Sequence, residues 1–214
     1  MSLPFSSFLL VWSIVALNTM TPGPNVVNTI ATAMSAGRRA GLGAAAGVGI
    51  GVALWCLAST LGFAEVFAAV PRAEFAMQCV ATALLGWLAL RALRLAWAGL
   101  HGARRGLPQA PAQLSYRRAL GRAILISAAN PKVLTTWLSI VTLFPVASAR
   151  SADIAVLALG SALIGLSFHS LYATVFSSGP AARFYLRAGW VIYLVAGAFF
   201  AILSAAMLTR LLRG

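Results

Sequence analysis

Two short motifs hold the residues best suited to chemistry, and each places proline within strongly apolar sequence. They are Thr21-Pro22-Gly23-Pro24-Asn25 and Asn130-Pro131-Lys132. Because proline has no N–H, each proline here leaves the carbonyl four residues earlier without its helical partner. The freed carbonyls are those of Asn18, Met20 and Ser127. In hydrocarbon such a group is costly unless it faces protein or water, so two matching breaks are typical of a transport site.

Both ends of a zwitterion can be matched at such breaks. Asn130 is a good N-cap and Pro131 suits the first helical position, so a half-helix with free N–H groups and a positive dipole end is expected there. Asn25 or Thr21 could start a similar half-helix at the first break. A carboxylate would sit against those N–H groups, and an ammonium against the freed carbonyls. The predicted substrate-binding residues are Asn18, Thr21, Pro22, Gly23, Pro24, Asn25, Asn130, Pro131 and Lys132.

Lys132 is the only lysine, and it falls near the middle of a predicted span. A charge there costs roughly 2.5–3.5 kcal/mol even on the lenient insertion scale, so it should face the interior. Three readings stay open: it carries a coupled proton, pairs with substrate, or bonds the broken-helix carbonyls and holds the fold. His169, off-centre in its span, is a second candidate for proton coupling, with hydrogen-bonded structure as the plainer reading.

The remaining polar side chains suggest no other chemistry. Asp153, Glu65 and Glu74 lie at span ends, so no acidic proton carrier is expected in the middle of the membrane. Cys56 and Cys79 fall inside spans without metal-ligand spacing and are interpreted as buried small hydrophobes. We therefore predict no metal site, no cofactor and no catalytic residue.

The elements that position these motifs are predicted membrane helices. Of the 214 residues, 61% are hydrophobic and only 9% are charged, whereas soluble domains carry about 25% charged residues. A spanning helix needs about 20 apolar residues. Six segments meet this length: about 5–35, 41–64, 74–98, 119–145, 152–176 and 188–209. The predicted fold is an all-α polytopic membrane protein with broken first and fourth spans.

Arginine placement predicts the topology. Eight arginines lie near the loops after the first, third and fifth spans, and four lie on the other side. Basic residues are retained on the cytoplasmic side of the membrane. The eight are therefore expected in the cytoplasm, and both termini on the outer side of the cytoplasmic (inner) membrane. Residues 101–118 form the one linker-like stretch within a single domain, 1–214. It separates halves of about 1–100 and 119–214. Three spans per half make the halves inverted, as in a 3+3 repeat.

Glycines in the second span indicate close helix packing. Gly43, Gly47 and Gly51 recur every four residues on one face, and Gly41, Ala45 and Gly49 form a row beside it. Small residues let another backbone approach, so this helix is predicted to be central rather than ligand-binding. An outward small-residue face would also be compatible with a homodimer.

The sequence resembles the LysE/RhtB family of small bacterial exporters of amino acids and metabolites. Thr21 to Asn25, with Gly37-Arg38-Arg39-Ala40-Gly41-Leu42, is similar to its N-terminal signature. Asn130-Pro131-Lys132, with Leu143-Phe144-Pro145, is similar to its fourth-span signature, and Arg187-Ala188-Gly189 leading to Gly197 is a weaker similarity. The resemblance implies export driven by the proton gradient. Val52 and Leu84 stand where some members carry an aspartate and an aromatic, so a carboxylate-based coupling route is not implied.

Other classes fit less well. A pore or facilitator could use the same two breaks without coupling, and proton-dependent uphill efflux would separate it from an antiporter. An intramembrane enzyme needs a nucleophile, base or metal cluster at depth, which one lysine and one histidine do not supply. Arginines spread singly or in pairs beside apolar spans are topology signals rather than a nucleic-acid footprint. The expected partners are a small-molecule substrate, protons and the lipid bilayer.

The topology prediction can be checked with single cysteines at Gln109 and Ala149 in a background lacking Cys56 and Cys79. An impermeant thiol reagent added to intact cells should label Ala149→Cys and leave Gln109→Cys protected. The opposite pattern would invert the topology.

Overall fold

The computed structural model describes residues 3–70, 73–101, 114–177 and 179–213, and all regular structure in these ranges is helical. The elements are α1 (Phe5–Met20), α2 (Pro24–Ala69), α3 (Ala73–Leu100), α4 (Tyr116–Ala128), α5 (Pro131–Leu143), the short 3-10 turn η1 (Val146–Ser148), α6 (Ser151–Val175) and α7 (Gly179–Arg213).

The first break separates α1 from α2. Thr21 is extended at the C-terminus of α1, and its hydroxyl donates to the Leu17 carbonyl at 2.6 Å. Helix α2 begins at Pro24, whose ring presets the helical φ. The expectation that Asn25 or Thr21 starts this half-helix is wrong, because Asn25 already lies in its first turn and Thr21 ends the preceding helix.

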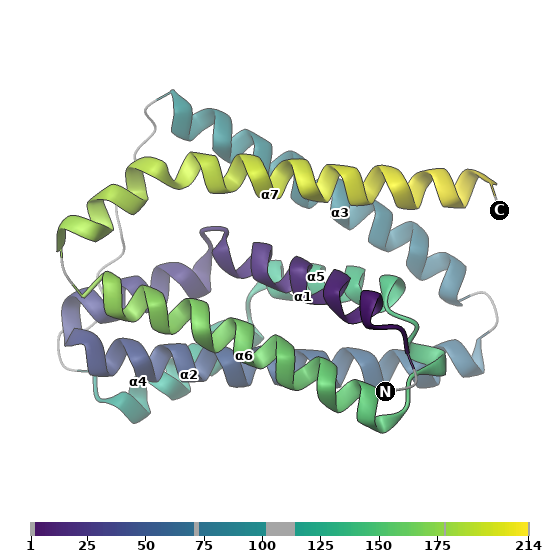
Figure 1. Cartoon of the computed structure of the whole chain (residues 1–214), viewed down its shortest axis with the longest axis horizontal. Coiled ribbons are helices and arrows are strands. Elements are labelled where there is room, and N and C mark those ends of the chain that lie inside the picture. Colours follow the sequence, from purple (N-terminus) through teal and green to yellow (C-terminus); the bar gives the residue numbers. More distant parts are fainter. Residues whose placement is uncertain (1–2, 71–72, 102–113, 178, 214) are drawn as a thin grey trace.

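Gly37 divides α2 into two segments, residues 24–36 and 38–69. Its φ of 83° and ψ of 170° are non-helical, and positive φ is readily adopted only by glycine. The second segment turns back along the first, as Figure 1 shows at the turn of the long helix. A Cβ at Gly41 would lie 3.2 Å from the Cα of Ala33, so the segments are in close contact.

The second break separates α4 from α5, which meet at an angle of 60°. The Asn130 side chain accepts a hydrogen bond from the Lys132 N–H at 3.0 Å, and Pro131 is at the first position of α5. The predicted N-cap and first-turn proline are confirmed. Half-helices therefore lie on both sides of each break.

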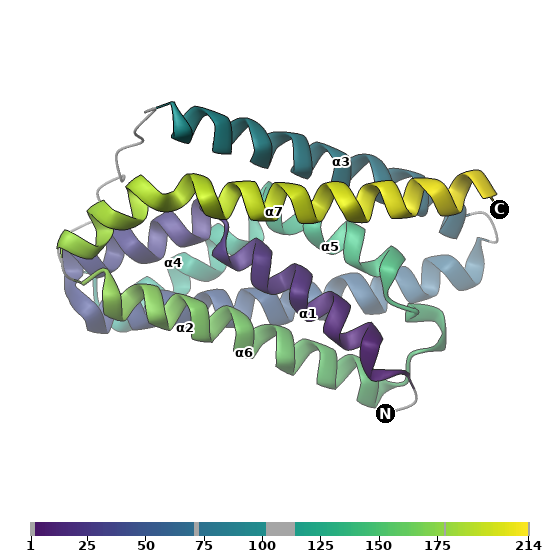
Figure 2. The same cartoon turned by 45° about the horizontal axis from the view of Figure 1, so that its top comes forward.

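Three half-helices lie between two outer groups of helices, and the fourth, α4, belongs to one of these groups. Helices α3 and α7 pack against each other on one side, and the second segment of α2 packs with α4 and α6 on the other. Between them lie α1, α5 and the first segment of α2 (Figures 1 and 2). The start of α1 and the end of α7 point toward the same end of the bundle. The breaks thus lie inside protein, as unpaired backbone in a membrane requires.

The glycine rows of α2 hold the second outer group together. A Cβ at Gly43 or Gly47 would collide with the backbone carbonyls of Tyr116 or Leu120 in α4. Gly49 faces α6, where a Cβ would lie 3.2 Å from the Ala162 carbonyl oxygen. The rows are packing surfaces, as predicted, but the segment that carries them belongs to the second outer group rather than to the middle of the bundle.

By length and composition, four helices can cross a membrane, or up to five if the bent pair α4–α5 counts as one span. Helix α1, with 16 residues, is shorter than a full span. The chain is therefore all-helical and multi-pass, and the six-span inverted repeat stays a prediction. Residues 102–113 of the predicted linker lie outside the described residues, and its last residues, 116–118, belong to α4.

The two cysteines differ in surroundings. Cys56 is fully buried, as expected, but Cys79 is exposed on α3. The expectation that both are buried in protein is wrong for Cys79, because an apolar side chain in a span can satisfy the hydrophobic requirement by facing lipid.

Gly47→Ala should lower the melting temperature in detergent. The added Cβ must push α4 away from α2, and overpacking of this kind costs typically about 1–3 kcal/mol. Gly62→Ala is the matched control, because nothing lies within 4 Å of a Cβ there. Equal melting temperatures for the two variants would contradict the close α2–α4 contact.

Candidate functional site

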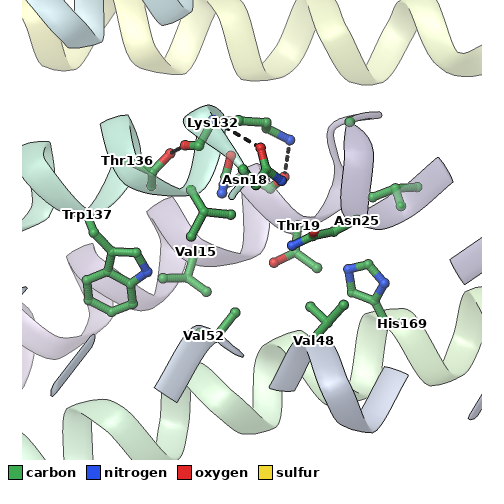
Figure 3. Close-up of a pocket in the computed structure, with 14 residues that line it drawn as sticks. Val15, Asn18, Thr19, Asn25, Val48, Val52, Lys132, Thr136, Trp137 and His169 are labelled. Atoms are coloured by element: carbon green, nitrogen blue, oxygen red, sulfur yellow. Dashed lines mark hydrogen bonds between the residues drawn. The ribbon is translucent and has the colours of Figure 1, made fainter. Parts of the chain in front are cut away.

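A small cavity lies where the two breaks meet. Its volume is about 30 Å³, room for one or two waters, so the site is closed around a space smaller than an amino acid. Figure 3 shows Lys132, Asn18 and Asn25 around one part of it and valines around another. The lining residues are Val15, Asn18, Thr19, Gly23, Asn25, Val26, Val48, Val52, Asn130, Lys132, Val133, Thr136, Trp137 and His169.

The Lys132 ammonium joins the two breaks. Its Nζ donates to the carbonyl oxygens of Asn18 at 2.6 Å and Thr21 at 2.7 Å. A Cβ at Gly23 would lie 3.2 Å from Cδ and 3.3 Å from Nζ of this lysine, so glycine leaves the room that the side chain occupies. An ammonium has three protons, so two carbonyls leave one for a further acceptor.

The other freed carbonyls also have donors from distant helices. The hydroxyls of Tyr172 and Tyr193 donate to the carbonyls of Met20 at 3.3 Å and Pro22 at 2.9 Å. The Trp55 indole donates to the Ser127 carbonyl at 3.1 Å. The expectation that the carbonyls of Asn18, Met20 and Ser127 are open to a substrate ammonium is therefore wrong for this closed arrangement, because protein donors occupy them.

The two half-helices differ at their N-termini. In α5 the N–H groups of Lys132 and Val133 donate to the side-chain and main-chain oxygens of Asn130, both at 3.0 Å. The expected free N–H groups are thus not found at α5. In α2 the N–H groups of Asn25 and Val26 have no acceptor among the described residues, and both residues line the cavity. The open positive helix end is therefore that of α2.

Two asparagine side chains add acceptors to the cavity. The Asn25 amide donates weakly to the Ser127 hydroxyl at 3.4 Å. The Oδ1 atoms of Asn18 and Asn25 are buried and have no hydrogen-bond partner within the described part of the chain. A buried amide oxygen without a partner is costly, so both oxygens are suited to a positively charged or N–H-bearing ligand.

His169 lies on the cavity wall opposite Lys132 (Figure 3) and is 1% exposed. Its Nδ1 is 2.7 Å from the Thr29 hydroxyl, which is also 3.0 Å from the Asn25 carbonyl. A hydroxyl has one proton, so when Thr29 donates to that carbonyl, the Nδ1–H of His169 donates to Thr29 and Nε2 is left as an acceptor. The histidine is thus linked to the start of α2.

The predicted site residues are mostly brought together. Asn18, Gly23, Asn25, Asn130 and Lys132 all line the cavity. Thr21 and Pro22 contribute only carbonyls, which Lys132 and Tyr193 occupy. Pro24 is exposed, and the side chain of Pro131 lies outside the described residues.

Sequence reasoning missed the apolar wall and the tyrosines. Val15, Val48, Val52, Val133 and Trp137 form that wall, and valines in a membrane span have no distinguishing signal. Tyr172 and Tyr193 could have been noticed, because a phenol inside a span needs a hydrogen-bond partner.

Lys132 and His169 are the ionisable side chains among the residues that line the cavity. Asp153 lies at the start of α6, where it accepts from the Arg150 N–H at 3.0 Å. Arg91 is exposed on α3 and lies over the Trp87 ring at 5.2 Å from its centroid. The described cavity wall thus provides two titratable groups and no carboxylate.

Comparison with known proteins identifies relatives across most of the chain. A family model with the description LysE type translocator matches residues 16–211. The uncharacterized membrane protein PA4757 of Pseudomonas aeruginosa is 32% identical over 120 residues, or 56% of this chain. The chain spans about half (55%) of that relative's length. No solved structure matches.

Lys132→Met should lower the melting temperature of the purified protein. Methionine keeps an apolar stem but leaves the Asn18 and Thr21 carbonyls without the ammonium, and a buried group without a partner costs about 1–3 kcal/mol. Lys132→Arg should lower the melting temperature less, because a guanidinium can still donate hydrogen bonds to these carbonyls. Leu134→Met, on the exposed side of α5, is the control. A Lys132→Met protein as stable as this control would show that the lysine does not hold the first break.

Proposed function

Because the chain belongs to the LysE type translocator family and is therefore a membrane transporter, we propose that it exports amino acids or closely related small metabolites in exchange for protons. The observation that carries this proposal is the closed cavity between the two broken helices. It presents donors for a carboxylate and acceptors for an ammonium within one small, buried space.

The carboxylate of a bound amino acid would lie at the start of α2. The N–H groups of Asn25 and Val26 have no protein acceptor among the described residues, and the positive end of a helix favours an anion. The remaining proton of the Lys132 ammonium is available beside them. Helix N-termini at broken spans hold anionic substrate groups in other transporters.

The ammonium would be bound by side chains rather than by the freed carbonyls. The Oδ1 atoms of Asn18 and Asn25 are the buried acceptors at the cavity that have no partner within the described residues. The substrate side chain would then face Val48, Val52 and Val133. The cavity must enlarge to admit any amino acid, so the present arrangement corresponds to a closed state of the transport cycle.

Lys132 and His169 are the proposed carriers of the coupled proton, because they are the titratable groups of the described cavity wall. Proton release by Lys132 would remove an ammonium from the Asn18 and Thr21 carbonyls and so loosen the first break. Protonation of His169 would change its hydrogen bond to Thr29, next to the open end of α2. Either change alters the groups that would bind the substrate.

The experiment is a transport assay in everted vesicles or proteoliposomes with a panel of amino acids and analogues. We expect accumulation of at least one against its gradient when a proton gradient is imposed, and loss of accumulation with a protonophore. Transport that only equilibrates the solute and ignores the proton gradient would identify an uncoupled facilitator. No transport of any panel member above empty vesicles would contradict the proposal.

Lys132 variants test the coupling role in the same assay, normalised to folded protein. Arginine keeps the charge but hardly releases a proton, whereas methionine loses both charge and proton. If Lys132 carries the proton, both variants lose uphill transport, although downhill exchange can persist. If it only pairs with the carboxylate, arginine retains part of the activity. Near-normal uphill transport by folded Lys132→Met would restrict the lysine to holding the break.

A further inference from the structure

The first segment of α2 carries a polar stripe that continues away from the cavity. Asn25, Asn28, Thr29 and Thr32 follow at helical spacing and therefore share one face. Each is at least nine-tenths buried, with exposed fractions of 8%, 7%, 0% and 0%. Polar side chains on a buried face of a membrane helix normally hydrogen-bond to a neighbouring helix.

Most of the polar atoms along this stripe have no partner in the described part of the chain. No hydrogen-bond partner is found there for the side-chain nitrogen and oxygen of Asn28, the Thr32 hydroxyl or the Asn25 Oδ1. Because an unpaired buried polar group destabilises the fold, a sequence that keeps several on one face is under a requirement other than stability.

Thr32 is the clearest case. Several other buried threonines donate to the carbonyl four residues earlier in their own helix, as Thr60 does to Cys56 at 2.7 Å and Thr136 does to Lys132 at 2.7 Å. The Asn28 carbonyl lies four residues before Thr32 in the same helix, but the Thr32 hydroxyl does not donate a hydrogen bond to it. Its hydroxyl is therefore free for something other than its own helix.

The cavity is polar toward one end of the bundle and apolar toward the other. The stripe runs from Asn25, on the cavity wall, to Thr32, in the direction of the turn at Gly37 and the exposed Arg38 and Arg39. On the opposite side, α1 and α5 fill the space with apolar side chains that are at most 2% exposed. These are Phe8, Val11, Ile14, Ile140, Val141 and Phe144.

The apolar side is closed by ring contact. The rings of Phe8 and Phe144 meet edge to face at 5.5 Å between centroids. On this apolar side, the Ser161 hydroxyl of α6 is the one buried polar side-chain atom that has no hydrogen-bond partner among the described residues. A polar solute that leaves the closed cavity would therefore find hydrogen-bonding groups in one direction and hydrocarbon in the other.

We propose that Asn25, Asn28 and Thr32 line a hydrated path between the cavity and the Gly37 end of the bundle, and that water and small zwitterionic solutes pass along it. By the arginine distribution this end is cytoplasmic. The identity of the solute rests on the proposed function, but the existence of the path does not. Phe8 and Phe144 close the other side while this path is in use.

The first test compares stability and transport in Thr32→Val and Thr60→Val. Valine at position 32 removes a hydroxyl without a partner, so the melting temperature should stay the same or rise. Transport should fall about five- to tenfold, which is the effect of losing one hydrogen bond to the solute. Valine at position 60 removes a satisfied hydroxyl and should leave transport within about twofold, since losing an intrahelical bond away from the path affects mainly stability. Equal transport by the two variants, or a clear loss of stability in Thr32→Val, would overturn the proposal.

The second test needs no knowledge of the solute. In a background lacking Cys56 and Cys79, Asn28→Cys and Thr32→Cys are treated with a small charged methanethiosulfonate reagent, with Ile14→Cys and Ile140→Cys as buried apolar controls. The two stripe variants should react at least about tenfold faster, because thiols react as hydrated thiolates. Equal rates at all four positions would overturn the path. Fast labelling without transport of any amino acid would support the path and reject amino-acid export.

Discussion

Every backbone carbonyl inside a membrane protein needs a hydrogen-bond donor, and the two prolines of the first break remove two donors within three residues. The tertiary structure replaces them from three other helices. Lys132 of α5 donates to the Asn18 and Thr21 carbonyls, while Tyr172 of α6 and Tyr193 of α7 donate to those of Met20 and Pro22. The break is therefore a junction on which α1, α5, α6 and α7 converge.

This requirement explains the arrangement of the helices. Broken backbone has to be enclosed by protein, so α1, α5 and the first segment of α2 occupy the middle and the other helices surround them. Close enclosure needs close contact between the surrounding helices. The small residues of α2 allow it, since Gly43 and Gly47 bring the α4 backbone near and Gly49 brings α6 near. The glycine rows thus support the site, although none of their residues lines the cavity.

The same junction relates fold to transport. Lys132 stabilises the break most strongly as a charged ammonium, so a structural lysine and a coupling lysine are not exclusive alternatives. A change in its protonation would alter the hydrogen bonds that hold α1 against α5. The cavity next to this junction has unpaired polar atoms on the side of Asn25, Asn28 and Thr32 and packed rings on the side of Phe8 and Phe144.

Local chemistry made some features predictable from the sequence. Proline cannot donate a backbone hydrogen bond, so both breaks could be located, and Asn130 followed by proline defines a helix start by itself. Apolar runs identified the helices of the membrane domain. Glycines at four-residue spacing identified α2 as a packing helix, because periodicity on a helix is a local property. Lys132 was recognisable as an interior residue from the cost of its charge alone.

Only the tertiary structure decided which donors meet which acceptors. The carbonyls of Met20, Pro22 and Ser127 could have faced a ligand, but side chains more than 70 positions away occupy them. Free N–H groups were expected at both half-helices and are found at α2 but not at α5, because Asn130 satisfies its own half-helix and Gly23 has no side chain to do so. Thr29 and the apolar wall belong to the site because of helix packing. Packing brings together residues far apart in the chain, and it leaves no local pattern in the sequence. The sequence by itself determined where the chain must break, and the packing of distant helices determined what each break can bind.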